Sequence, residues 1–476
     1  MIGELKPYSA YKDSGLPWLG EVPEHWEVVP LSSIARPRKV TNEEHRDLLS
    51  VYLGRGVIPF TSVEEKRTNT TSEDLSKYQL VEPGDFVLNN QQAWRGSVGV
   101  SRYTGIVSPA YLVLALDKRL DREFADKLFS DRAMVAQYLV CSKGVGSIQR
   151  NLYWLHLKRA ATVIPPLPEQ TQIATFLDYA DRRIRRYIRS KQKLIKLLEE
   201  QKQIIINQAV TRGLDPTVPL KPSGIEWLGD IPDHWEVSRL KFEASQIVDC
   251  LHATPEYVDD GIYPAIRTAD IEPGKLRLKT VRRVNEEQYL LWTSRMTPRA
   301  GDILYSREGE RFGIAAIVPE GVELCISQRM MAFRIRSSQD SEFIMWQLNC
   351  RHVYAQASGD IIGATSPHVN VERIKNYEIV LPPLNEQKCI ASEIEKRCSD
   401  LEKAIACTHD DISLLREFRT RLIADVVTGK LDVREASAHL PAELDEPEPL
   451  EDDLPNPELD SDADSYLEAT AEDEAA

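Results

Sequence analysis

The strongest constraint on how this chain folds is an internal repeat whose two copies lie 217 residues apart. The first copy spans Leu167–Asp215 and opens with Leu-Pro-Glu-Gln, and the second spans Leu384–Asp432 and opens with Leu-Asn-Glu-Gln. Each copy follows a Pro-Pro pair, which prevents a helix from beginning any earlier. Because the period is far longer than a solenoid unit, it indicates a duplicated domain together with the helix that follows it.

A second repeat leads into each globular unit. Ser14–Val28 returns as Ser223–Val237, and both follow the pattern Ser-Gly-x-x-Trp-Leu-Gly-x-x-Pro-x-His-Trp-Glu-Val. We call this segment the clasp, because its two Trp, its Gly turn and its Pro predict a short aromatic closure where the chain enters each unit. The histidines His25 and His234 invite a catalytic interpretation. A structural role is favoured, because in the sequence neither stands beside a nucleophile or a set of metal ligands.

The segments between these repeats carry a mixed pattern of strands and helices. Short apolar runs bounded by Gly and Pro predict strands, and apolar residues at helical spacing predict one helix over Asp121–Val140. In the second unit Glu342–Ala357 takes the place of that helix. Gly84-Asp85 and Gly301-Asp302 precede matching strands, and we interpret their Asp residues as turn caps rather than catalysts. The two units therefore share these landmark positions, whereas the residues between the landmarks differ.

Each long repeat predicts a helix with a heptad seam of apolar residues. Some forty residues at 1.5 Å each make a rod about 60 Å long, and a lone rod would expose its apolar seam to water. We therefore expect the two helices to pack on each other. The first seam comprises Ile173, Leu177, Ala180, Ile184, Tyr187, Lys191, Leu194, Leu198, Gln201 and Ile205, and the second Ile390, Ile394, Leu401, Ala404, Leu415, Phe418 and Leu422.

The length of 476 residues suits two or three domains rather than a single core. The fold class predicted is α+β, with two mixed α/β domains alternating with two long helices in a pseudo-twofold repeat. The predicted division is a first globular domain with its clasp (1–166), a first helix (167–215), a second globular domain (216–383), a second helix (384–434) and a tail (435–476). The tail is rich in Pro, Asp, Glu and Ala, so we expect it to be disordered.

The net charge of −15 belongs to the tail. Glu435–Ala476 holds sixteen acidic and no basic residues, so the rest of the chain carries 59 basic and 58 acidic side chains. A nearly neutral body neither supports nor excludes a nucleic-acid partner, because a basic cleft can be local. Seven Cys without a C-x-x-C pair indicate reduced thiols in a cytoplasm. No apolar run is long enough to predict a membrane span.

Motifs for catalysis are missing from the sequence. It has no G-x-x-x-x-G-K-[ST], no G-x-G-x-x-G after a strand, and none of the Pro-Pro-aromatic motifs with which amino-methyltransferases hold a flipped base. It also lacks H-E-x-x-H and G-x-S-x-G. Cys389, Cys398 and Cys407 are nine residues apart, so successive thiols on a helix point to opposite sides and form no metal site. These absences predict a chain without catalytic, metal or cofactor sites.

The order of these features resembles the specificity (S) subunit of type I restriction–modification systems. That family is similar in having a globular unit, then Pro-Pro-Leu-x-Glu-Gln opening a long helix, and then the same arrangement again, with the clasp at each entrance. The resemblance covers Ser14 to Asp432, and its landmarks recur in order at offsets of 209 and 217. Asn385 departs from the first copy, which has Pro168, and should alter the helix start without changing the function. The acidic tail is not part of the family pattern.

The resemblance implies a division of labour. Each globular unit would be a target recognition domain that reads one half of a bipartite, asymmetric site on double-stranded DNA. The two helices would pair antiparallel as a coiled-coil spacer that sets the gap and docks two methyltransferase (M) subunits. S-adenosylmethionine would belong to the M subunits, which methylate adenine N6, and ATP and Mg to restriction (R) subunits. This chain would itself be a non-catalytic, cytoplasmic DNA-binding subunit with no cofactor.

Base contacts are expected where Arg, Lys, Asn or Gln side chains leave loops or strand ends. Each such loop has a second interpretation, as an ordinary solvated loop. The candidates in the first unit are Asn90, Gln91, Gln92, Trp94 and Arg95, and in a later loop Gln149, Arg150, Asn151 and Tyr153. The candidates in the second unit are Arg307 and Arg311, and in a later loop Thr365, Ser366, His368 and Asn370.

Two other functions remain as alternatives. One is a scaffold protein that joins partners through its paired helices without reading a DNA sequence. The other is a nuclease or methyltransferase in its own right, which the missing motifs disfavour.

Overall fold

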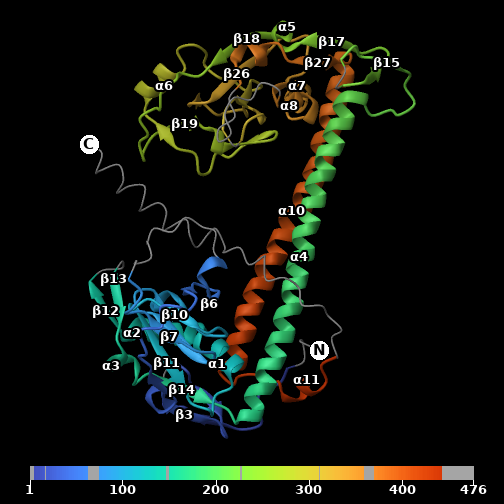
Figure 1. Cartoon of the computed structure of the whole chain (residues 1–476). Coiled ribbons are helices and arrows are strands. Elements are labelled where there is room, and N and C mark those ends of the chain that lie inside the picture. Colours follow the sequence, from blue (N-terminus) through green and yellow to red (C-terminus); the bar gives the residue numbers. More distant parts are fainter. Residues whose placement is uncertain are drawn as a thin grey trace. The chain divides into compact units, whose positions relative to one another are not determined.

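The structure is a computed structural model that describes residues 5–16, 18–62, 74–145, 149–225, 228–309, 311–358 and 369–441 (Figure 1). The chain forms two compact units, of which the first consists of residues 1–189 and 412–476 and the second of residues 190–411. Each unit holds one globular domain and part of each long helix, α4 (Leu167–Arg212) and α10 (Leu384–Val427). The start of the tail forms the short helix α11 (Arg434–Ala438), and residues 442–476, where disorder was expected, lie outside the described residues.

The first globular domain is built on a four-stranded antiparallel sheet, in the order β4 (Ala35–Pro37), β11 (Tyr111–Leu116), β8 (Asp85–Asn89) and β9 (Val98–Val100). Phe86 of β8 stacks on Phe129 of α1 (Arg122–Phe129) with ring centroids 4.5 Å apart, so α1 packs against this sheet. Paired strands complete the domain: β1 (Tyr11–Asp13) with β2 (Glu21–Pro23), β3 (Glu27–Pro30) with β14 (Ala161–Ile164), β5 (Leu49–Tyr52) with β6 (Gly56–Pro59), β7 (Gln79–Val81) with β10 (Gly105–Val107), and β12 (Ser142–Val145) with β13 (Gln149–Leu152).

The second globular domain has the same kind of sheet, in the order β18 (Ala244–Asp249), β26 (Met330–Ile335), β23 (Ile303–Ser306) and β24 (Ala315–Ile317). Phe343 of α7 (Ser341–Leu348) shares a buried core with Tyr305 and Phe333 of this sheet. The remaining strands are β15 (Leu220–Pro222) with β16 (Asp230–Pro232), β17 (Glu236–Arg239) with β27 (Glu378–Leu381), β19 (Tyr263–Ile266) between β22 (Arg283–Val284) and β25 (Cys325–Ile326), and β20 (Ile271–Glu272) with β21 (Lys275–Leu276).

The repeated frame extends to the pairing register. Glu27 of β3 lies opposite Ile164 of β14, and Glu236 of β17 lies opposite Leu381 of β27, so both partners keep the sequence offsets of 209 and 217. The Asp of each Gly-Asp pair accepts a main-chain hydrogen bond: Asp85 from Glu82 N and Asp302 from Arg299 N, each at 2.8 Å. Their predicted role as turn caps is confirmed.

The prediction of one helix over Asp121–Val140 is wrong. The segment contains two helices, α1 and α2 (Arg132–Cys141), because the Asp131 carboxylate accepts from Ala133 N at 2.9 Å and caps a new helix start. The second domain has the same break, since α7 ends at Leu348 and α8 (Arg351–Ser358) begins three residues later. Apolar spacing alone does not reveal a break of this kind, because Phe124 and Leu128 of α1 and Met134 and Tyr138 of α2 are all buried in one core.

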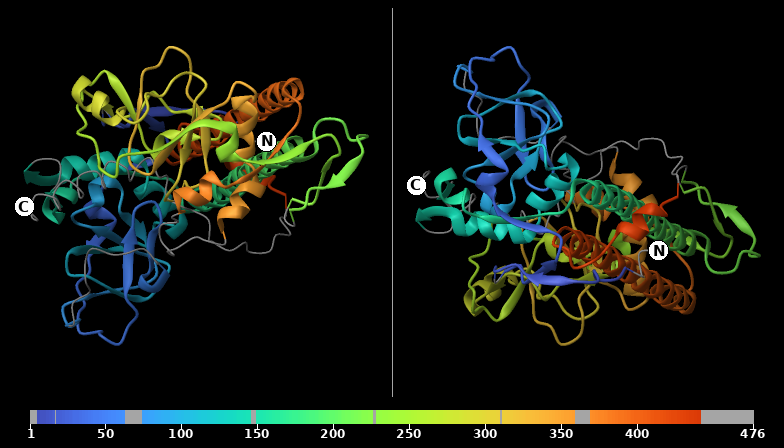
Figure 2. Two further views of the ribbon diagram at one scale, coloured as in Figure 1. Left: turned by 90° about the horizontal axis from the view of Figure 1, so that it is seen from above. Right: turned by 90° about the horizontal axis from the view of Figure 1, so that it is seen from below.

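The long helices are confirmed, and within each unit they lie side by side and antiparallel (Figures 1 and 2). Ion pairs join them at Asp181–Arg419 in the first unit and at Lys191–Asp411 and Lys202–Glu402 in the second. Residues nearer the C-terminus of α4 pair with residues nearer the N-terminus of α10, so the two helices run antiparallel. Burial disfavours the Glu402 carboxylate, but hydrogen bonds from Lys202 and from Lys275 of the globular domain hold its pKa below the usual value.

The buried stripe of α4 departs from the predicted heptad seam. The first four predicted positions, through Ile184, are buried, whereas Tyr187 and Leu194 are exposed and Ile195 is buried instead. Phe418 of α10 is likewise exposed. An α-helix has 3.6 residues per turn, so a strict 3.5-residue repeat drifts by about 20° per heptad on a straight helix. The predicted seam is therefore wrong beyond the first half of α4, although the pairing itself is confirmed.

A glutamate in the first turn of α4 fastens the first clasp to the helix. Glu169 accepts hydrogen bonds from Trp26 Nε1 at 3.0 Å and from the Tyr8 hydroxyl at 2.8 Å, and it bonds His25 Nε2 at 2.7 Å. Trp26 is fully buried, and the Glu169 side chain is only 6% exposed. Burial and the bond to this carboxylate raise the pKa of Tyr8. The Glu of the repeated motif is thus a buried acceptor shared by three aromatic side chains.

The second unit repeats this junction. Glu386 of α10 accepts from Trp235 Nε1 at 3.1 Å and bonds His234 Nε2 at 2.8 Å. Among the described residues, no tyrosine hydroxyl donates to this carboxylate, and its side chain is 32% exposed. The structural role predicted for both clasp histidines is confirmed, because each one is tied to the glutamate of its own motif.

The glutamine beside each glutamate fastens the globular domain to the same helix start. Gln170 accepts from Asp121 N and donates to Pro165 O, both at 2.8 Å, and Gln387 makes the same pair of bonds with Asp340 N and Pro382 O. Both side chains are fully buried. Asp121 and Asp340 are the N-caps of α1 and α7, so the Glu-Gln dipeptide connects clasp, long helix and domain at one point.

The first clasp also closes on the end of α10. Gly429 follows that helix with φ of +80°, and a Cβ there would lie 2.8 Å from Pro23 Cγ and 3.0 Å from the ring of Trp26. Nearby, Asp432 N donates to Lys6 O at 2.8 Å. Gly429 is therefore required both for its left-handed backbone and for the close approach of the clasp.

We expect Gly429→Ala to destabilise the chain, because its methyl group would overlap the clasp. Gly84→Ala is the matched control, since Gly84 also has a positive φ (+97°) but a Cβ there would have nothing within 4 Å. Thermal or denaturant unfolding of both variants should show Gly429→Ala to be the less stable by about 1–3 kcal/mol, the usual effect of overpacking. Equal stability would mean that the clasp does not close tightly on α10.

Candidate nucleic-acid interface

Polar loops of each domain gather at one edge of its central sheet. In the first domain β8 ends at Asn89, opposite Tyr111, where β11 begins. In the second domain β23 ends at Ser306, opposite Met330, where β26 begins, and β18 ends beside them at Asp249. The loops that leave and enter these strands therefore lie together. We call these places the first edge and the second edge.

Main-chain hydrogen bonds hold the predicted loop at the first edge. Gln92 N donates to Asn89 O at 3.0 Å, and Arg95 N donates to Gln92 O at 2.9 Å. The indole Nε1 of Trp94 donates to Gln91 O at 2.9 Å. The side chains of Gln91 and Arg95 are exposed. A loop fixed by its own backbone presents such side chains at defined positions, which recognition of a base edge requires.

The β12–β13 hairpin brings the later predicted residues to the same place. Leu152 N donates to Asn90 O at 2.9 Å and links the hairpin to the loop. The guanidinium of Arg95 lies 4.8 Å from the Trp94 ring centroid, and that of Arg150 lies 6.0 Å from it. This is the range of a cation–π contact, which orients both cations over one aromatic ring. Gln149 opens β13, and Asn151 and Tyr153 are exposed.

Sequence reasoning missed one cation of this surface. Lys143 of β12 is exposed and lies directly opposite Asn151 of β13. Lys143 comes just after the segment that the sequence predicts to be helical, and neither a loop pattern nor a strand pattern there indicates a functional residue. The side-chain oxygen of Asn90 is buried and has no hydrogen-bond partner among the described residues. The first edge thus combines cations, amides and an aromatic ring, the groups that contact phosphates, base edges and exposed bases.

At the second edge the predicted arginines are held by the protein itself. Arg307 is only 4% exposed, with its guanidinium 2.5 Å from Glu308 and 3.4 Å from Asp249. Arg311 is half-buried and donates to Ala269 O at 3.0 Å. Both cations lie just after the end of β23, and their contacts within the protein stabilise the loops of this edge.

The other predicted residues of the second unit are only partly described. Asn370 is exposed, and its side-chain oxygen accepts from Glu372 N at 2.9 Å, which makes it the N-cap of α9 (Val371–Lys375). This capping bond explains why an Asn stands there. Thr365, Ser366 and His368 lie outside the described residues.

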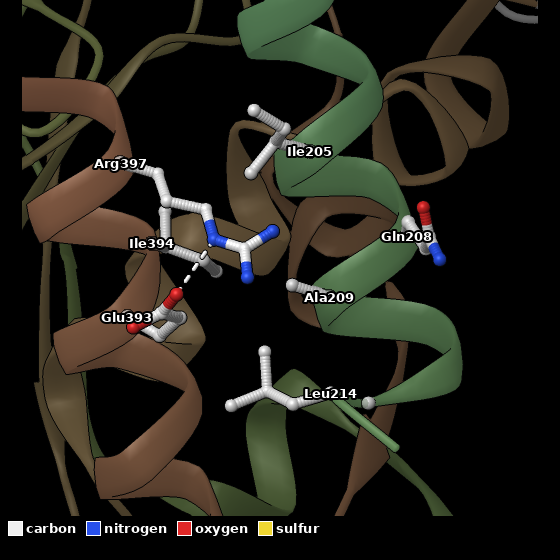
Figure 3. Close-up of a pocket in the computed structure, with 8 residues that line it drawn as sticks. Ile205, Gln208, Ala209, Leu214, Glu393, Ile394 and Arg397 are labelled. Carbon is white, nitrogen blue, oxygen red and sulfur yellow. Dashed lines mark hydrogen bonds and ion pairs between the residues drawn. The ribbon is translucent and has the colours of Figure 1, made fainter. Parts of the chain in front are cut away.

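A small cavity lies in the second unit between α4 and α10 (Figure 3). Its walls include the apolar side chains of Ile205, Leu214 and Ile394, and beside them Arg397 Nε donates to Glu393 Oε1 at 2.6 Å. The cavity volume of about 70 Å³ is far below the ~300–1,000 Å³ of small-molecule sites. This cavity is a gap in helix packing, smaller than an ordinary small-molecule site.

Across the described ranges, no three His, Cys, Asp or Glu side chains come together as a metal site. In the same ranges, no helix combines the length and the apolar character that crossing a bilayer requires.

Known proteins resemble this chain over most of its length. Residues 232–406 match the family model described as the type I restriction modification DNA specificity domain. The chain is 23% identical over 434 residues to the type I restriction enzyme MjaVIII specificity subunit of Methanocaldococcus jannaschii, which covers 87% of this chain and 94% of that protein. It is 23% identical over 442 residues to the putative type I restriction enzyme MjaX specificity subunit of the same organism, covering 87% and 96%.

One solved structure has a similar fold. It comes from work on complex assembly and conformational transition of the type I R-M system, and it matches 86% of this chain and 99% of its own chain. The sequence identity is 17% and the TM-score is 0.62. This likeness confirms the predicted α+β fold with its pair of long helices.

Proposed function

We propose that the chain is a specificity subunit of a type I restriction–modification system and that it chooses the DNA site for such a complex, which the matching family model and the relatives support. Each globular domain (1–166 and 216–383) reads one half of a bipartite, asymmetric site on double-stranded DNA. The helices (167–215 and 384–434) connect these two DNA-reading domains. The chain is non-catalytic and holds no cofactor. Two M subunits supply S-adenosylmethionine and adenine methylation, and R subunits supply ATP- and Mg-dependent restriction.

One observation carries this proposal, namely that unlike side chains occupy the same edge of a repeated sheet. The first edge bears Gln91, Trp94 and Arg95, whereas the second bears an ion-paired cluster around Arg307. The strands that hold the two edges match in order and direction. Two domains with one frame and different edges suit the reading of two different half-sites. A scaffold would not require such variation at matching positions.

The helices suit the role of a spacer. α4 has 46 residues, which at 1.5 Å each correspond to a length of about 69 Å. The length of a helix depends on its residue count alone, and the gap between half-sites is a geometric quantity. We therefore propose that the residue count of the paired helices sets the permitted gap.

An exposed apolar stripe on α4 supports the docking of M subunits. Leu194, Leu197 and Ile204, all in the second unit, follow one another three and seven residues apart and are 40%, 51% and 63% exposed. They lie off the buried stripe that faces α10. Contiguous apolar surface of this kind marks a protein interaction site. A partner helix that covers this stripe would bury it in the manner of a helical bundle.

Combined substitution of Gln91, Gln92 and Arg95 by Ala should abolish or alter specific DNA binding by the assembled complex. The loop should persist, because its backbone hydrogen bonds do not involve these side chains. Each lost base contact weakens discrimination by about 1–3 kcal/mol. Binding and footprinting of the complex on its own target measure the effect, and Lys118→Ala, an exposed cation beyond the other end of β11, is the control. Unchanged binding and methylation at the same sites would refute the assignment of this loop.

Replacement of Leu197 and Ile204 by Glu should weaken the association with M subunits about tenfold or more, because burying uncompensated charge is strongly unfavourable. Lys196→Glu, on another face of α4, makes the same change of −2 in net charge and is the control. Co-purification and titration of M subunits against each variant provide the measurement. If the double variant bound M subunits as tightly as the control variant, the stripe would not be the docking surface.

The runner-up function is a helical scaffold without sequence reading. A footprint separates the two, because two DNA readings predict two protected patches with an open gap between them. A scaffold predicts no protected patch at a fixed sequence. An activity assay on the chain alone, expected to show neither methylation nor cleavage, tests the third alternative of an enzyme.

A further inference from the structure

Arg329 occupies the middle of the second edge. It immediately precedes Met330, the first residue of β26, and β26 lies between β18 and β23 in the sheet. The loops that follow β18 and β23 therefore stand on either side of it. Its side chain is 52% exposed, in contrast to the 4% of Arg307 beside it. Of these two arginines, Arg329 is the one whose guanidinium can reach a ligand in solvent.

The backbone at Arg329 adopts a conformation that arginine rarely takes. Its φ is +65°, in the left-handed region that favours Gly and Asn. Neighbouring contacts hold this conformation: Ser327 N donates to Ile266 O at 2.8 Å, and Arg307 N donates to the carbonyl of Arg329 itself at 2.8 Å. Strained residues held by the surrounding structure are concentrated at functional sites. The strain is an observed feature here, and the fold gives no packing reason for an Arg at this position.

Acidic side chains next to Arg329 leave its guanidinium only loosely engaged. Glu308 Oε2 lies 3.8 Å from Arg329 Nε, beyond hydrogen-bond distance, while the same carboxylate lies 2.5 Å from Arg307. Asp249 lies 3.4 Å from Arg307 and 3.2 Å from His252. Arg307 thus takes the tight ion pairs of the cluster. Arg329 remains attracted to Glu308 at a distance that an incoming acceptor can replace.

The matching position of the first domain carries no such group. Met330 and Tyr111 are the first residues of the matching strands, so Arg329 corresponds to Ala110. Ala110 is exposed and has no side chain that could read DNA. The cation is therefore a property of the second domain alone and not of the repeated frame, as expected for a residue that serves one half-site and not the other.

We propose that Arg329 contacts the DNA of the second half-site, a proposal that rests on the function assigned above. The guanidinium offers parallel N–H donors to a pair of acceptors, and two such pairs occur on DNA: O6 and N7 of guanine in the major groove, and the oxygens of a backbone phosphate. The side chain exchanges its loose attraction to Glu308 for one of these acceptor pairs.

The test uses the assembled complex and duplexes that carry its own methylated target, with each base pair of the second half-site changed in turn. Arg329→Asn removes the cation yet tolerates the left-handed backbone, so the fold should persist. Arg329→Lys keeps the charge but not the planar fork. Arg336→Asn is the control, because Arg336 is exposed at the opposite end of the same strand. Thermal unfolding should be the same for the two Asn variants.

Arg329→Asn should weaken binding to the target by about 5- to 150-fold, whereas Arg336→Asn should bind as the wild type does. A guanine contact predicts that Arg329→Asn and Arg329→Lys both lose discrimination at one G·C pair. A phosphate contact predicts a uniform loss for Asn, rescue by Lys, and a salt dependence whose slope falls by about 0.9. Wild-type binding by Arg329→Asn would overturn the proposal while leaving the proposed function intact. Failure of the wild-type complex to bind its target would overturn both.

Discussion

The rest of the structure depends on a carboxylate in the first turn of each long helix, buried at Glu169 and partly exposed at Glu386. Glu169 accepts from the indole of Trp26, and Glu386 accepts from that of Trp235 at the equivalent place. A hydrogen bond to a charged acceptor contributes about 1.5–3 kcal/mol, and its loss would leave a buried indole N–H unsatisfied. Because the adjoining Gln fastens the cap of a domain helix, one dipeptide fixes the clasp, the domain and the helix together. This junction determines the direction in which each globular domain leaves its helix, and therefore where the edge of its sheet lies within the unit.

The features that the sequence predicted well are those with local physical causes. The long helices begin where Pro-Pro ends and run as the repeat predicted, and the clasp histidines have the structural role that their surroundings indicated. The errors have causes that involve distant residues or exact geometry. The break at Asp131 depends on a side-chain cap, and the heptad seam of α4 drifted because the helix keeps 3.6 residues per turn. The burial of Arg307 depends on Asp249, which is 58 residues away in the sequence, and no local pattern reveals such a pairing.

The two sheet edges show how one frame can serve two recognition tasks. Strand order, register and the Glu-Gln junction are common to both units, and they account for most of the sequence that repeats. At the first edge two arginines lie over one aromatic ring. At the second edge carboxylates pair with the buried Arg307, whereas Arg329 is exposed. Under the proposed function, the repeated residues stabilise the fold and the unrepeated ones select the DNA. Under the proposed function, such a separation lets edge residues change without loss of the fold.

The central claim is that the chain joins two DNA readings by helices whose length fixes the gap between them. The most direct measurement is a map of methylated adenines in cells that carry the M subunits with either the natural chain or a chain lacking one facing heptad in each helix. The ion pair Lys191–Asp411 places residues 192–198 of α4 opposite residues 404–410 of α10, and these are the segments to remove. The natural chain should direct methylation to one asymmetric bipartite sequence, and the shortened chain to the same two halves with a shorter gap. A contiguous target, or a gap that does not change when the helices are shortened, would contradict the account.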